Sequence, residues 1–293
     1  MLKGITFSLL ASFLFGYLYY FSTLLMPLKG TDIFGYRIIF TLPFVALAVV
    51  VFKQRLALVQ HLKRIQNQPH LSLIFLINGA MMGFQMWLFL WAPNNGSALS
   101  VSFGYLLLPI VMVAAARFIF KEKISRLKFI AVIIATIGVC STILIKGEIS
   151  WEAIAISFGY TFYFSLRKAF KFTDLGAFFL EMSSLLPICI YFAWQVDIPQ
   201  IQQSNPHILG LLFILGLLSG IALNAYIAAS NFLPMNLLGL LGYVEPILMF
   251  GISLLIGEKM DSESYPLFFC LIIAMIFIIT DSVLKIKRKK HAV

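Results

Sequence analysis

Long apolar runs separated by short polar segments dominate the pattern of this chain. A helix needs about 20 mostly apolar residues to cross the ~30 Å hydrocarbon layer of a membrane. Ten runs meet this requirement, and each of them predicts a membrane-spanning helix. Their expected bounds are Gly4–Leu24, Ile33–Phe52, Leu71–Trp91, Ala98–Phe118, Leu127–Ile145, Trp151–Ala169, Leu175–Trp194, Ile208–Ala229, Leu237–Ile256 and Glu263–Leu284. The longest connection, Lys53 to His70, predicts an amphipathic segment at the membrane surface.

Two stretches of the chain are nearly identical. Phe15 to Ser22 reads FGYLYYFS and Phe158 to Ser165 reads FGYTFYFS, with six of the eight positions the same. Further matches follow in the same order, at separations of 137 and then 136 residues. They pair Gly79 with Gly216, Gly83 with Gly220, Ala92 with Ala229, Asn94 with Asn231, Pro109 with Pro246, and Glu122–Lys123 with Glu258–Lys259. Because the matches keep their order, we predict two five-helix copies, residues 1–146 and 147–293.

An odd number of spans in each copy places the second copy upside down relative to the first. The predicted fold class is therefore an all-α integral membrane protein with ten transmembrane helices in two inverted five-helix repeats. Inverted repeats of this kind hold a binding site near the membrane midplane and expose it to each side in turn by rocking. The repeat therefore predicts a carrier that works by alternating access.

Composition and charge indicate a membrane protein. They also explain the positive net charge without a nucleic-acid partner. Hydrophobic residues make up 61% of the chain and charged residues 12%, compared with about 25% charged residues in soluble domains. The net charge is +10, but 18 of the 22 Lys and Arg residues fall on one side of the predicted bundle. The positive-inside rule makes that side cytoplasmic, together with both termini. The expected partners are the lipid bilayer and a small-molecule substrate, and the oligomeric state stays open.

The five-plus-five pattern, with Glu-Lys after each fourth span, resembles the drug/metabolite transporter superfamily of the EamA type. The runs GITFSLLASFLFGYLYYFSTLL, WAPNNGSALSVSFGYLLLPIV and LEMSSLLPI are most similar to its RarD-like branch, and the resemblance covers nearly the whole chain. It implies export of a small metabolite across a bacterial inner membrane, above all an amino acid or an amino-acid-like compound. A chloramphenicol-like amphipathic drug, or import of a scavenged metabolite, are the alternatives. Glu245 in GYVEP departs from the branch, where we expect a neutral residue.

Ionisable residues at membrane depth are the first candidates for a functional site, because burying them is costly. Glu245 is expected near the middle of the ninth span, and Glu181 two turns inside the seventh. If transport is coupled to protons, one of these two carboxylates must carry the proton, although a facilitator would have the same sequence. Glu181 is also placed to form a plain ion pair with Arg167. Arg37 either contacts substrate or extends to the head groups.

Uncharged polar and aromatic residues complete the predicted substrate site. Tyr17 and Tyr20 share one helix face, as do their repeat mates Tyr160 and Tyr163, because each pair is three residues apart. Aromatic stripes of this kind also serve packing. The remaining candidates are Asn78, Gln85, Trp87, Tyr105, Asn224 and Tyr243.

Other functional classes lack the residues that they require. No clustered aspartates are present to hold a metal for a membrane transferase, and no Walker A lysine loop is present for an ATP-driven pump. The three cysteines, Cys140, Cys189 and Cys270, lie in apolar runs and predict no disulfide framework. We therefore predict no enzyme activity, no metal and no cofactor.

Overall fold

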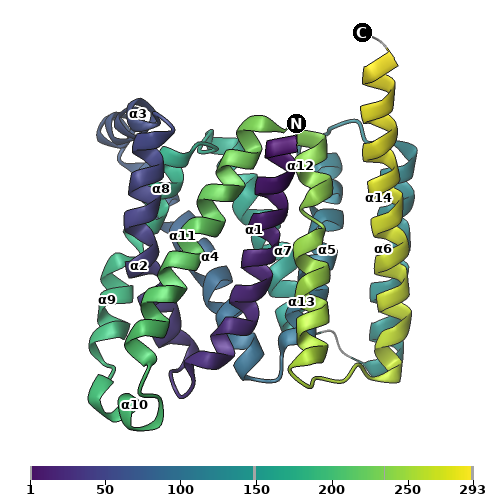
Figure 1. The fold of residues 1–293 in the computed structure, drawn as a ribbon. Helices are drawn as coiled ribbons and strands as arrows, with labels where there is room; N and C mark the ends of the chain where they lie inside the picture. Colours follow the sequence, from purple (N-terminus) through teal and green to yellow (C-terminus); the bar gives the residue numbers. More distant parts are fainter. Residues whose placement is uncertain (1, 148–149, 234, 292–293) are drawn as a thin grey trace. The chain divides into compact units, whose positions relative to one another are not determined.

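The computed structural model describes residues 2–147, 150–233 and 235–291, and in these residues all regular structure is helical (Figure 1). The α-helices are α1 (Leu2–Phe21), α2 (Gly30–Val51), α3 (Arg55–Asn67), α4 (His70–Trp91), α5 (Ala98–Phe118), α6 (Arg126–Lys146), α7 (Trp151–Phe170), α8 (Leu175–Ser184), α9 (Leu186–Trp194), α10 (Ile198–Ser204), α11 (Ile208–Phe232), α12 (Met235–Leu241), α13 (Val244–Leu255) and α14 (Tyr265–His291). Short 3₁₀ turns are η1 (Ser22–Leu25), η2 (Ala92–Asn94) and η3 (Ser262–Ser264).

Helices lie at each of the ten predicted segments, and α3 occupies the predicted surface connection. Within the described residues, seven helices are long and apolar enough to cross a membrane, and α8 with α9 makes an eighth candidate if the bent pair is one span. Helix α7 has 20 residues, but Arg167 and Lys168 in its last turn lower its apolar character. These apolar helices support a multi-pass membrane protein, while the count of ten spans stays a prediction.

Two predicted spans are interrupted, and a proline lies close to each break. Helices α8 and α9 meet at Leu185 with a bend of 41°, and Pro187 lies in the first turn of α9. Helices α12 and α13 are separated at Gly242 and Tyr243, and Pro246 lies in the first turn of α13. A proline is tolerated there because the first turn of a helix needs no N–H for its own hydrogen bonds. By contrast, the prolines of α2 and α5 lie inside continuous helices.

The chain forms two compact units, and each unit combines segments from both halves of the sequence. The first unit contains residues 1–16, 96–161 and 228–293, and the second contains 17–95 and 162–227. These units differ from the predicted copies 1–146 and 147–293, which stay a prediction. The ends of those copies, Met1 and Val293, lie outside the described residues, as do the side chains of Lys285 to His291 in the basic tail.

In the first unit, α6 and α14 run side by side (Figure 1). Gly138 on α6 permits the close approach, since a Cβ at this position would lie only 2.6 Å from the Cβ of Cys270 on α14. Ala131, Ala135 and Ala274 extend the same tightly packed core. Small residues bring helices together in membranes in this way, because close van der Waals packing supplies the attraction.

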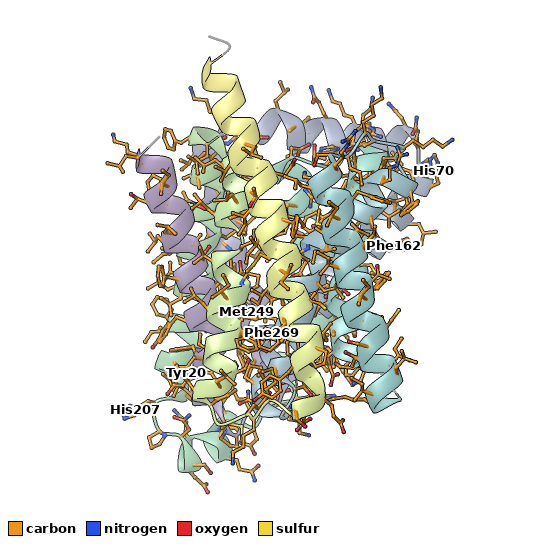
Figure 2. The ribbon with its side chains drawn as sticks, turned by 90° about the vertical axis from the view of Figure 1, so that its right-hand side faces the viewer. Tyr20, His70, Phe162, His207, Met249 and Phe269 are labelled. Carbon is orange, nitrogen blue, oxygen red and sulfur yellow. The ribbon has the colours of Figure 1, made fainter. Side chains whose placement is uncertain are left out.

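In the second unit, α2 packs against α8 and α9, and α4 packs against α8. The surface helix α3 runs across the end of α4, near the labelled His70 (Figure 2). Phe75 of α4 stacks on Phe172, with their ring centroids 4.1 Å apart, and the imidazole of His61 contacts both rings edge-on. This aromatic cluster joins α3 to α4 and to the connection between α7 and α8.

Candidate functional site

The second unit contains a fully buried carboxylate. Glu181 on α8 has no exposed surface. Its Oε2 accepts hydrogen bonds from the Tyr163 hydroxyl, at 2.8 Å, and from Nη1 of Arg167. Its Oε1 accepts a hydrogen bond from the Asn78 amide at 3.2 Å. We call these four residues, Asn78, Tyr163, Arg167 and Glu181, the polar network, and they join three helices, α4, α7 and α8.

The spacing of α7 brings two members of the polar network onto one helix face. Tyr163 and Arg167 are four residues apart, which is about one helical turn. Nη1 of Arg167 donates to the Tyr163 hydroxyl at 2.7 Å, and the guanidinium lies over the Tyr163 ring. Its Nη2 donates to the backbone carbonyl of Asp174 at 3.0 Å. The Arg167 side chain is therefore held by side chains of α7 and α8 and by a backbone carbonyl of the connection between these helices.

Asp174 links the polar network to the surface helix α3. Asp174 is the N-cap of α8, and its Oδ1 accepts a hydrogen bond from the backbone N–H of Ala177 at 2.9 Å. Its Oδ2 lies 2.6 Å from Nε2 of His61. Partial burial would raise the pKa of Asp174, but the hydrogen bonds from His61 and Ala177 outweigh it and hold that pKa below its usual value. A continuous chain of polar contacts thus leads from α3 to Glu181.

One acceptor of the polar network has no hydrogen-bond partner among the described residues. Asn78 is fully buried, and while its Nδ2 bonds to Glu181, its Oδ1 makes no hydrogen bond. Gly79 beside it lets α4 approach α8, because a Cβ there would lie 2.9 Å from the Glu181 carbonyl oxygen. Leaving a buried polar group unsatisfied costs about 1 to 3 kcal/mol, so this acceptor needs an explanation.

A second buried cation in the same unit lies in a different environment. Arg37 on α2 donates from Nε to the Ser219 hydroxyl of α11 at 3.0 Å, and its guanidinium lies 5.2 Å above the ring centre of Phe89. Arg37 is 4% exposed, so other residues of the protein enclose it. Nearby on α11, Asn224 donates to the carbonyl of Gly220.

Four of the predicted site residues lie in the first unit, and three of them are tyrosines. The hydroxyls of Tyr105 on α5 and Tyr160 on α7 lie 3.3 Å apart. Tyr243 is buried at the break between α12 and α13, and its hydroxyl has no hydrogen-bond partner among the described residues. Glu245 lies in the first turn of α13, where the partial positive charge of a helix N-terminus favours a carboxylate.

The structure brings some of the predicted site residues together and separates others from them. Asn78, Tyr163 and Glu181 meet in the polar network, whereas Tyr17 and Tyr20 are exposed by 45% and 39%. Gln85 and the indole Nε1 of Trp87 are buried elsewhere on α4.

The sequence prediction missed several polar contacts. The pairing of His61 with Asp174 and the contact of Ser219 with Arg37 each join residues more than 100 positions apart. Arg167 was expected only as an ion-pair partner, although its spacing from Tyr163 signals a shared face. Within the described residues, no group of three or more His, Cys, Asp or Glu side chains is arranged to hold a metal ion.

Comparison with known proteins identifies clear relatives. The sequence profile of the EamA-like transporter family matches residues 2–144. An "uncharacterized transporter" of Haemophilus influenzae is 68% identical over 290 residues, covering 99% of this chain and 97% of the relative. The "chloramphenicol-sensitive protein RarD" of Pseudomonas aeruginosa is 36% identical, covering 89% of this chain and 88% of the relative. A crystal structure that is 15% identical has a similar fold, with a TM-score of 0.57 over 95% of this chain and 98% of the other.

Proposed function

Because this chain belongs to the EamA-like transporter family of the drug/metabolite transporter superfamily and is a multi-pass membrane transporter, we propose that it is a secondary transporter that works by alternating access. The proposed cargo is an amino acid or an amino-acid-like compound, and the proposed direction is export.

The observation that carries this proposal is the packing of predicted repeat mates against each other. The second span, α2, packs against the seventh, which is α8 with α9. The fourth span, α5, packs against α13 of the ninth, and the fifth span, α6, packs against the tenth, α14. Two independent halves would not require these three pairings. An inverted repeat favours them, because in each pair a span of one copy packs against its mate in the other copy. This favours the rocking mechanism of inverted-repeat carriers.

The buried charges favour a substrate with both signs of charge. An intramembrane carboxylate and an intramembrane guanidinium are functional candidates by default, because both are costly to bury. The polar network supplies one of each, and Arg37 adds a second cation. If transport is coupled to protons, Glu181 and Glu245 are the proposed proton carriers.

A second candidate function is export of an amphipathic drug. It rests first on the name of the Pseudomonas aeruginosa relative, which connects that protein to chloramphenicol. The paired hydroxyls of Tyr105 and Tyr160 offer the aromatic surroundings that such a molecule would favour.

We further propose that the protein lies in a bacterial inner membrane with both termini in the cytoplasm. Reporter fusions at the C-terminus and within residues 63–68, at the end of α3, should then report the cytoplasm, and a fusion at Asn95 should report the opposite side. The same side for the C-terminus and Asn95 would contradict the inverted five-helix repeat.

The experiment that tests the function begins with a metabolite screen of cells that overproduce the protein. The compound whose external concentration changes is then measured in proteoliposomes, with wild type and Glu245→Gln side by side. We expect Glu245→Gln to lower transport about tenfold or more if this carboxylate takes part in transport. No transport of any amino acid, with transport of chloramphenicol instead, would favour the second candidate.

A further inference from the structure

The polar network combines two opposite charges with an acceptor, Oδ1 of Asn78, that has no hydrogen-bond partner among the described residues. We propose that Asn78, Arg167 and Glu181 bind the α-ammonium and α-carboxylate groups of a zwitterionic amino acid, which deepens the proposed function and rests on it. The ammonium would bind between Oε1 of Glu181 and Oδ1 of Asn78. The carboxylate would bind to the guanidinium of Arg167.

The charge of the polar network determines which ligand costs least to bury. Arg167 and Glu181 form a direct ion pair in which Glu181 is fully buried and the Arg167 side chain is 9% exposed. A ligand with one net charge would leave that charge uncompensated in a low-dielectric site. A zwitterion brings one charge of each sign, so it adds two contacts between opposite charges and leaves the site neutral. The polar network therefore favours an amino acid over a simple amine or a simple acid.

Hydrogen-bonding capacity remains for both ends of such a ligand. Among the residues that the structure describes, Oε1 of Glu181 accepts a hydrogen bond from Asn78 alone, and a carboxylate oxygen can accept two. Oδ1 of Asn78, which faces no donor among the described residues, supplies a second acceptor next to it. Arg167 uses Nη1 for Tyr163 and Glu181 and Nη2 for Asp174, and a guanidinium has five N–H donors. Because Arg167 contacts Glu181 directly, the two binding positions are adjacent, as the two groups of an α-amino acid are.

The first test measures binding directly, without transport. Thermal unfolding of the purified full chain in detergent is followed with each standard L-amino acid in turn, because a ligand that binds the folded state raises the midpoint. For the amino acid with the largest effect, the decarboxylated amine and the deaminated acid with the same side chain are then compared. We expect each of these analogues to bind about tenfold more weakly or worse, since each lacks one charge-assisted interaction.

Three outcomes of this test would overturn the proposal. In the first, no amino acid raises the unfolding midpoint. In the second, the amine raises the midpoint as much as the amino acid does, and in the third, the acid does so. Transport of some other compound in the metabolite screen would still leave the protein a transporter, so this proposal and the proposed function can fail separately.

A variant then separates recognition from structural support. Asn78→Leu removes the unpaired acceptor but leaves the ion pair of Arg167 and Glu181 in place. We expect it to weaken amino-acid binding about tenfold, as the loss of a hydrogen bond to a charged group should. Asn67→Leu, at the exposed end of α3, is the matched control and should bind like wild type. A lower unfolding midpoint for Asn78→Leu with unchanged amino-acid binding would assign Asn78 to structure and contradict the proposal.

Discussion

Helices are joined in two different ways in this protein. In the first unit, α6 and α14 meet through Gly138 and a set of alanines. In the second unit, α4, α7 and α8 meet through the polar network around Glu181. The first contact depends on the size of the side chains, and the second depends on their charge and hydrogen-bonding groups.

This difference teaches which contact can also recognise a ligand. Lipid tails are as apolar as the side chains of α6 and α14, so close packing is what holds those helices together. The polar network costs more to bury, because charges must be removed from water and then compensated. A contact built from alanines cannot discriminate a charged ligand, whereas Arg167 and Glu181 can.

Removing one charge of the polar network should have the largest effect. Arg167→Leu leaves the carboxylate of Glu181 buried without its cation, which costs about 3 to 5 kcal/mol in comparable pairs. The double variant Arg167→Leu with Glu181→Leu removes both charges and should recover most of that stability. Denaturant unfolding in detergent measures both variants. A double variant as unstable as the single one would show that the ion pair is not what the substitution disrupts.

Adding bulk to the small-residue contact should have an intermediate effect. Gly138→Leu inserts a side chain where even a Cβ would lie 2.6 Å from Cys270, and overpacking of this kind costs about 1 to 3 kcal/mol. Gly251→Leu in α13 is the matched control, because a Cβ there meets no atom within 4 Å. Thermal unfolding of the two variants compares them. Equal midpoints would contradict the close approach of α6 and α14.

The smallest effect should come from the link between α3 and the polar network, and it depends on pH. The pKa of Asp174 is lowered in the folded protein, so its contribution to stability is present above its unfolded pKa of about 3.9. That contribution is lost as the pH falls through the lower folded value. Asp174→Asn should therefore flatten the fall in unfolding midpoint below about pH 4, while Asn still caps the helix.

The matched control for this prediction is Asp197→Asn, which changes the N-cap of α10 in the same way. In Asp197→Asn, the unfolding midpoint should fall below about pH 4 as it does in wild type. If both variants respond to pH alike, the pairing of His61 with Asp174 does not set the acid limb of stability.

Most helix positions were predictable, because the apolar runs are long and the polar residues between them are few. The run Ala98–Phe118 matches α5 at both ends. The bend between α8 and α9 lies beside Pro187, a residue type that removes a backbone hydrogen bond and so marks a kink in the sequence. The break before α13 likewise lies close to a proline, Pro246, although the apolar run continues through Gly242 and Tyr243 without a charged residue.

The candidate site was harder to predict, because its members come from distant parts of the chain. Glu181 and Arg167 stood out as charges in apolar surroundings, but nothing in the local sequence selects Asn78 as their partner across 103 positions. Tyr17 and Tyr20 match Tyr160 and Tyr163 in the repeat, yet Tyr163 is 2% exposed while the first pair is largely exposed. Equivalent positions in a repeat therefore do not guarantee equivalent surroundings.

The most direct test of the central claim is counterflow in proteoliposomes with the amino acid that the metabolite screen identifies. Wild type, Glu181→Gln and Gly138→Leu are compared per amount of folded protein, so that the last variant reports the effect of destabilisation alone. We predict that wild type and Gly138→Leu accumulate the labelled amino acid equally, and that Glu181→Gln accumulates about one tenth or less. Accumulation by Glu181→Gln at the wild-type level would contradict a functional role for the polar network.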